Sequence, residues 1–167
     1  MALINISHII AYGTVLSLIG SGIILLSLYV NPRLWLQDYP RKIQQKAQPK
    51  TREEKRQSLY WGVPFLVVLF TIPFLSAWTL RHQHPASASF LNLFLTAFGV
   101  GLFFNIVDLV IIDCLIFCLW TPGFLIIPGT GGMDAYRDFG HHFKGFLVGI
   151  MVSIVASLII ATIVRIV

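Results

Sequence analysis

The chain has 167 residues, of which 56% are hydrophobic and only 11% are charged, and its mean hydropathy is +0.80. Soluble domains carry about a quarter charged residues, so this composition excludes an ordinary soluble domain and indicates a membrane protein. The formal net charge is +5, but eight of the twelve Lys and Arg residues fall in one loop, without interleaved stacking aromatics. This placement argues against nucleic-acid binding and favours contact with a membrane surface.

Four apolar segments approach or exceed the roughly 20 residues that a membrane-spanning helix needs. They cover residues 9–30, 59–80, 88–118 and 145–164. The third is long for one crossing, and a fifth span over 109–128 is the alternative. No Gly or Pro turn separates that fifth span from the third helix. We therefore expect a single domain, an all-α integral membrane protein with a bundle of about four transmembrane helices.

The distribution of Lys and Arg predicts the orientation of this bundle. The loop over 31–58 holds eight of them and the loop over 121–144 holds two, whereas Arg81 and Arg165 stand alone on the other side. Basic loops stay in the cytoplasm. We therefore expect both termini outside the cytoplasm, in a bacterial-type plasma membrane.

The first basic loop contains three signals. Residues 32–40 mix Trp, Tyr and Leu with charge, as is typical at the level of the lipid headgroups. The stretch 41–50 is strongly basic, which predicts contact with anionic lipids or, alternatively, with an acidic partner. Thr51 and Glu54 form a capping-box pattern that should start the helix leading into the second span.

The segment before the last span is rich in Pro and Gly. Residues 121–129 have an apolar centre between these helix breakers, which predicts a re-entrant or interfacial segment. Asp134 follows a glycine-rich turn and is predicted to cap the helix that leads into the fourth span. Helical spacing would then align Asp134, Asp138 and His141.

Small residues at four-residue spacing mark helix contacts in membranes. One stripe lies on the fourth span and one on the first, and they can meet within one chain, in a homo-oligomer or against a membrane partner subunit. The stripes comprise Gly145, Gly149, Ser153 and Ser157 on the fourth span and Gly13, Ser17 and Ser21 on the first.

Asp108 and Asp113 are the acidic residues placed at membrane depth, where a carboxylate costs about 2.5 to 3.5 kcal/mol near the centre. In an α-helix these two side chains would point about 140° apart. Such acids are functional candidates by default. The candidate catalytic residues are Asp108, Asp113, Asp138, His141 and His142, and the candidate ligands of a divalent metal are Asp113, Asp138, His141 and His142.

A structural alternative is a network in which Arg137 and Lys144 neutralise Asp108 and Asp113 at the cytoplasmic boundary. The glycines near 130 lack the Lys of a P-loop, and no H-E-x-x-H pattern occurs. We therefore expect a small oligomerising transport, proton-handling or accessory membrane module. The alternative is a membrane-embedded enzyme, metal-dependent or acid–base, that acts on a lipid or lipid-linked substrate.

Overall fold

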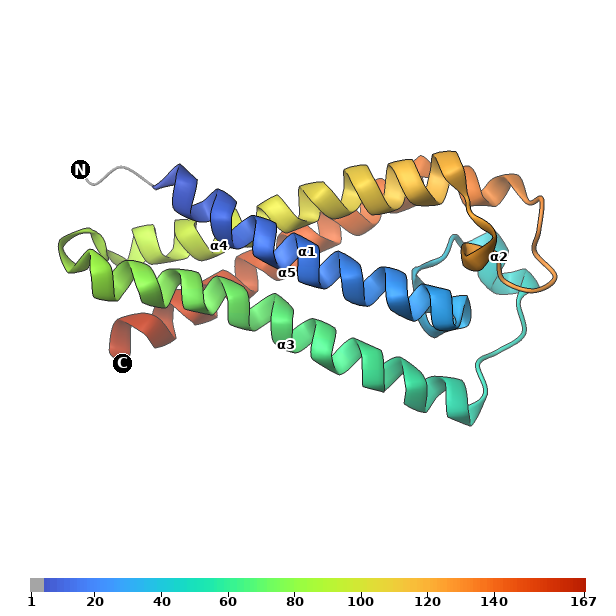
Figure 1. Ribbon diagram of the computed structural model, residues 1–167, viewed down its shortest axis with the longest axis horizontal. Coiled ribbons are helices and arrows are strands. Elements are labelled where there is room, and N and C mark those ends of the chain that lie inside the picture. The colour runs from blue at the N-terminus through green and yellow to red at the C-terminus, as the bar shows by residue number, and fades with distance from the viewer. Residues whose placement is uncertain (1–4) are drawn as a thin grey trace.

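The computed structural model describes residues 5–167, and this part of the chain is helical, with no β-strand. Four helices are long and apolar enough to cross a membrane, so the chain is an all-α integral membrane protein. The start of the first helix and the end of the last lie at one end of the bundle (Figure 1). The spans are α1 (Ile6–Val30), α3 (Arg52–Gln83), α4 (Phe90–Val107) continued by the π-helix η3 (Asp108–Trp120), and α5 (Phe139–Ile166).

Short elements connect these spans. At the end that we call the loop end, η1 (Pro32–Asp38) and α2 (Arg41–Lys46) follow α1, and η4 (Gly123–Leu125) and η5 (Asp134–Arg137) precede α5. At the opposite end, η2 (Pro85–Ser87) joins α3 to α4.

The third span is one continuous helix of 31 residues, so the described chain contains no fifth crossing. Its backbone changes at Asp108 from α-helical to π-helical hydrogen bonding. A π-helix bonds residue i to residue i+5, so side chains five residues apart come close to the same face. The expectation that Asp108 and Asp113 point about 140° apart assumed an α-helix. It is wrong, because the π-helix brings the two side chains close to one face.

Helix α4 packs against all three other spans. A Cβ added at Gly149 of α5 would collide with the side-chain amide of Asn105, and Asn105 Nδ2 donates a hydrogen bond of 2.9 Å to Ser153 Oγ. A Cβ at Gly13 of α1 would come within 2.7 Å of the Phe103 ring. Both small-residue stripes therefore face α4.

The remaining stripe residues have different roles. Ser157 is buried, and Ser17 Oγ donates 2.8 Å to the Gly13 carbonyl within α1. Ser21 Oγ is buried without a hydrogen-bond partner in the described chain. Nothing lies within 4 Å of a Cβ added at Gly145, which is exposed at the loop end.

The end that carries the termini is closed by close packing of α3, α4 and α5. Arg81 Nη1 also donates 2.6 Å to the carbonyl of Arg165, which ties α3 to the end of α5. The buried side chains here are Ala77, Leu80, Leu93, Ala97, Ile160, Ala161 and Val164.

At the loop end, Arg33 holds η1 against the start of α3. Its Nε lies 2.5 Å from Glu54 Oε1, and its Nη2 donates to the carbonyls of Gln48 and Pro49. The predicted capping box is confirmed, because Glu54 N–H donates to Thr51 Oγ1 and Thr51 N–H donates to Glu54 Oε2. The Arg33 bonds fix the position of η1 against the start of α3 and the segment before it.

The Pro/Gly-rich segment packs on η1 and α2 at the loop end (Figure 1). Its Leu125 and Ile127 side chains are fully buried. Tyr39 O–H donates 2.9 Å to the Leu125 carbonyl, and burial raises the pKa of Tyr39, so the phenol stays a neutral donor. Gly129 and Gly132 have φ of +82° and +77°, which only glycine adopts readily.

The prediction that Asp134 caps the last helix is wrong. Asp134 opens the short helix η5 instead, and Asp138 caps α5 by accepting 2.9 Å from the backbone N–H of His141. Because α5 begins only at Phe139, Asp134 does not share a helical face with Asp138 and His141.

Candidate acid–base site

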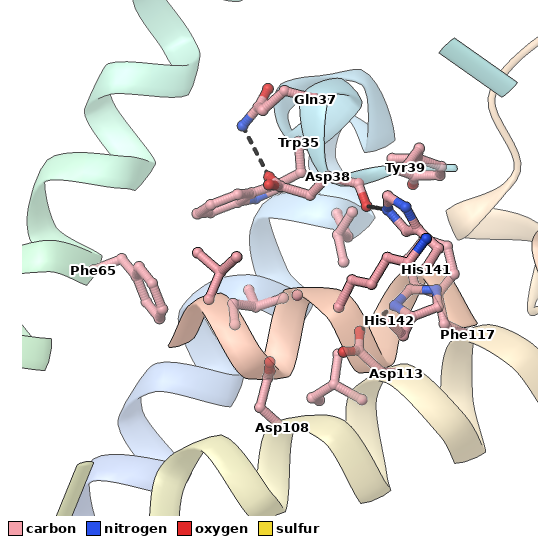
Figure 2. Close-up of a pocket in the computed structure, with 16 residues that line it drawn as sticks. Trp35, Gln37, Asp38, Tyr39, Phe65, Asp108, Asp113, Phe117, His141 and His142 are labelled. Atoms are coloured by element: carbon pink, nitrogen blue, oxygen red, sulfur yellow. Dashed lines mark hydrogen bonds and ion pairs between the residues drawn. The ribbon is translucent and has the colours of Figure 1, made fainter. Parts of the chain in front are cut away.

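A cavity of about 520 Å³ lies at the loop end, between the last turns of α1, η1, α3, η3 and the first turns of α5. Figure 2 shows Asp108 and Asp113 on one side of it and Trp35 and Asp38 on the other. The apolar lining includes Ile24, Leu28, Trp35, Phe65, Ile112, Phe117 and Val148, and the polar lining includes Gln37, Asp38, Asp108, Asp113, His141, His142 and Lys144.

The π-helix supplies one wall of this cavity. Asp108, Ile112, Asp113 and Phe117 are spaced by four and five residues, and all four line it. The turn that bonds i to i+5 places such a set on one side, whereas an α-helix would spread it around the axis. The change of helix type therefore gathers the two carboxylates in one place.

Asp113 and His142 form a direct pair. His142 Nδ1 lies 2.8 Å from Asp113 Oδ1, and His142 is only 5% exposed. A carboxylate accepts hydrogen bonds, so Nδ1 carries the proton of this bond, and in the neutral form of the ring the free lone pair is on Nε2. His142 Nε2 is buried and has no hydrogen-bond partner within residues 5–167. A carboxylate that orients an imidazole in this way prepares its far nitrogen to accept a proton.

Asp108 provides a second unpartnered group. Its Oδ1 is buried and, in the described chain, has no hydrogen-bond partner. A buried polar atom without a partner is costly, typically about 1 to 3 kcal/mol. Such atoms are rare in folded proteins, so Asp108 is a candidate contact for a bound molecule.

His141 has a different role from its neighbour. Its Nε2 lies 2.9 Å from the backbone carbonyl of Asp38, so Nε2 carries the proton and donates. The Asp38 carboxylate accepts 2.9 Å from Gln37 Nε2. His141 thus ties the start of α5 to η1, and it lies beside the Asp113–His142 pair rather than within it.

The four candidate metal ligands do not form one cluster. Asp113 and His142 pair with each other, Asp138 caps α5, and His141 contacts Asp38. Within residues 5–167 no group of three or more His, Cys, Asp or Glu side chains is close enough to hold one metal ion.

The expected neutralising network is also not formed. Within residues 5–167 Arg33 pairs with Glu54 and His142 is hydrogen-bonded to Asp113, and neither Arg137 nor Lys144 pairs with Asp108 or Asp113. Arg137 is exposed. Arg137 is the last residue of η5, and because α5 begins only at Phe139, Arg137 does not follow the helical register of α5.

Several residues of the cavity were not among the sequence candidates. Trp35 and Asp38 come from η1, and Phe65 comes from α3. The mixture of aromatic and charged residues over 32–40 was noted in the sequence, but it predicted a position at the lipid headgroups and not the wall of a cavity. Phe65 carries no signal, because it is one of many apolar residues in its span.

No family model, curated protein or solved structure matches this chain.

Proposed function

We propose that this protein is a proton-handling membrane module, in which Asp113 and His142 move a proton to or from a molecule bound in the loop-end cavity. The observation that carries the proposal is the 2.8 Å contact of Asp113 Oδ1 with His142 Nδ1 in the wall of a cavity, with His142 Nε2 buried and unpartnered. The volume of about 520 Å³ is in the range of small-molecule sites.

The reactivity of His142 tests the proposal. Diethyl pyrocarbonate acylates the free lone pair of a neutral imidazole, and peptide mass spectrometry gives a rate for each histidine. We expect His142 to react through the cavity although its side chain is buried. Asp113→Asn should slow that reaction about tenfold, which corresponds to the loss of a charge-assisted hydrogen bond of about 1.4 kcal/mol.

Asp134→Asn is the matched control, because Asp134 is exposed and outside the cavity. It should leave the rate at His142 unchanged. The exposed His84 gives the reference rate in every variant. An inert His142 beside a fully modified His84, or an Asp113→Asn variant with the wild-type rate, would contradict the proposal.

Proton handling by this pair would serve either transport or an acid–base enzyme that acts on a lipid or lipid-linked substrate. An enzyme that acts on a lipid is favoured by Phe65 and Val148, because these residues place one side of the cavity between the membrane-spanning helices α3 and α5. Liposomes with an imposed pH gradient and an internal dye distinguish them. Proton flux that His142→Ala abolishes supports transport, whereas a reactive His142 without flux supports the enzyme.

We also propose that the loop end faces the cytoplasm of a bacterial-type plasma membrane and contacts anionic lipids. The support is the exposed basic surface of Arg41, Lys42 and Lys46 on α2. The stripes that suggested a homo-oligomer contact α4 of the same chain. A second copy would therefore use another face.

A further inference from the structure

Beside the cavity, the outer surface between α3 and α5 carries an apolar groove of about 390 Å³. The groove adjoins the cavity along α5, since Val148 lines the cavity while Met151 and Val152, one turn further on, line the groove. Its walls are formed by Phe70, Met151, Val152, Val155, Ala156 and Ile159.

The two helices that bound this groove separate toward the loop end. Near the termini α3 and α5 are joined by buried side chains and by the Arg81 bond to Arg165, whereas at the loop end the cavity lies between them. Figure 1 shows the same separation of the two ribbons. The side of the bundle between α3 and α5 therefore presents, at the loop end, a cavity that contains polar side chains, followed by an apolar track on the membrane-spanning helices.

The cavity selects for a group that donates hydrogen bonds. Asp108 Oδ1 is an unpartnered acceptor, and His142 Nε2 is a second one while the Nδ1 proton is held by Asp113. Three carboxylates, Asp38, Asp108 and Asp113, line the cavity against one ammonium, Lys144. A cationic donor such as a primary ammonium satisfies both the acceptors and the charge.

Lys144 lies at the exposed side of the same cavity. Asp108 and Lys144 line one cavity, so the cavity offers an anionic group and a cationic group to the ammonium and the phosphate of one zwitterionic headgroup. The groove along α5 then receives an acyl chain, because its walls are almost wholly apolar.

We propose that the cavity and groove together bind one aminophospholipid, with its primary ammonium at Asp108 and His142, its phosphate at Lys144 and an acyl chain along α5. This inference deepens the proposed function by naming the class of molecule bound at the same site. Binding can nevertheless be measured without any proton transfer.

The test compares headgroups on identical acyl chains. Purified, delipidated protein is titrated in detergent with phosphatidylethanolamine, phosphatidylcholine or phosphatidylglycerol, and bound lipid is counted by native mass spectrometry. Phosphatidylcholine has no N–H donor and phosphatidylglycerol has no cation. We expect phosphatidylethanolamine to bind at least about tenfold more tightly than either, the factor that one charge-assisted hydrogen bond supplies. Equal binding of the three lipids would overturn the inference, and this comparison needs no variant.

Variants then locate the lipid. Asp108→Asn should reduce the preference for phosphatidylethanolamine about tenfold, since the amide carries no charge. Val155→Trp should fill the groove and weaken binding, whereas the control Leu158→Trp, which is also exposed on α5 but outside the groove, should not. Equal effects of the two tryptophans would contradict the placement of the acyl chain.

The two proposals fail separately. A reactive His142 in a protein without headgroup preference would overturn the lipid inference and leave proton handling intact. A protein that prefers phosphatidylethanolamine but has an inert His142 would support the lipid site and contradict proton handling.

Discussion

Gly149 lies where α5 approaches α4 most tightly, against the side-chain amide of Asn105. That amide is not free to move aside, because its Nδ2 donates 3.0 Å to the Gly101 carbonyl and 2.9 Å to Ser153 Oγ. An added methyl group must therefore break these bonds or separate the helices. In lipid, where close packing supplies much of the attraction between helices, either change is costly.

We predict that Gly149→Ala lowers the free energy of unfolding by about 1 to 3 kcal/mol, the usual cost of overpacking. Unfolding by sodium dodecyl sulfate in mixed micelles, followed by circular dichroism, measures it. Gly145→Ala is the control, because its Cβ would meet nothing within 4 Å. It should be neutral, or stabilising by up to about 1 kcal/mol through helix propensity. An equal loss in both variants would contradict the packing argument.

The small-residue spacing predicted helix contacts at single residues, and in the structure Gly13, Gly149 and Ser153 contact α4. It did not predict the contacted helix, because spacing identifies a face and not its neighbour. Asp113 and His142 were both candidates from the sequence. Their pairing, however, requires that η3 and α5 bring together two residues that are 29 positions apart in the chain. No local pattern carries that information.

At the scale of elements, the π-helix η3 is the feature that the sequence conceals. Apolar residues on almost every side of Asp108–Trp120 leave no periodicity that separates a π-helix from an α-helix. The capping box at Thr51 and Glu54 could be predicted from the sequence because its pattern spans only four consecutive residues. The Asp134 cap was misassigned because Asp138, four residues later, offers the same carboxylate.

The Pro/Gly-rich segment is held by a closed set of hydrogen bonds. Ile127 N–H donates 2.9 Å to Tyr136 Oη, which lies 2.6 Å from Thr130 Oγ1, and Thr130 Oγ1 donates to the Ile127 carbonyl. All three residues are buried. Since Thr130 uses its own proton on Ile127, Tyr136 donates to Thr130.

We predict that Tyr136→Phe destabilises this segment by about 1 to 3 kcal/mol, because it leaves the Ile127 N–H buried without an acceptor. Hydrogen–deuterium exchange should accelerate over 126–131 and stay unchanged in α4. Tyr60→Phe is the control, since Tyr60 is 67% exposed. Wild-type exchange over 126–131 in Tyr136→Phe would show that the hydroxyl does not hold the segment.

At the scale of the whole molecule, the two ends of the bundle differ. One end is sealed by buried side chains of α3, α4 and α5, and the other holds the cavity beneath η1. The number of spans followed from composition and length alone, which is why it was predictable. The cavity was not, because its walls come from five separate elements and several of its lining residues carry no chemical signal of their own.

The charge on the two ends predicts which compartment reaches the cavity. The loops over 31–58 and 121–144 carry ten Lys and Arg residues, and the rest of the chain carries two. A bias of this size predicts that the loop end, and with it the mouth of the site, faces the cytoplasm. Gln45 of α2 and Gln83 at the end of α3 are both exposed and lie at opposite ends of the bundle.

We therefore expect Gln83→Cys, in intact cells, to react with a membrane-impermeant maleimide, and Gln45→Cys to react only after permeabilisation. The wild-type chain is the control for its own thiols, because Cys118 is buried and Cys114 is partly buried inside the third span. If Gln45→Cys were labelled in intact cells and Gln83→Cys were protected, the protein would have the opposite orientation. The Asp113–His142 pair would then face the outer compartment, and any headgroup that it binds would come from the outer leaflet.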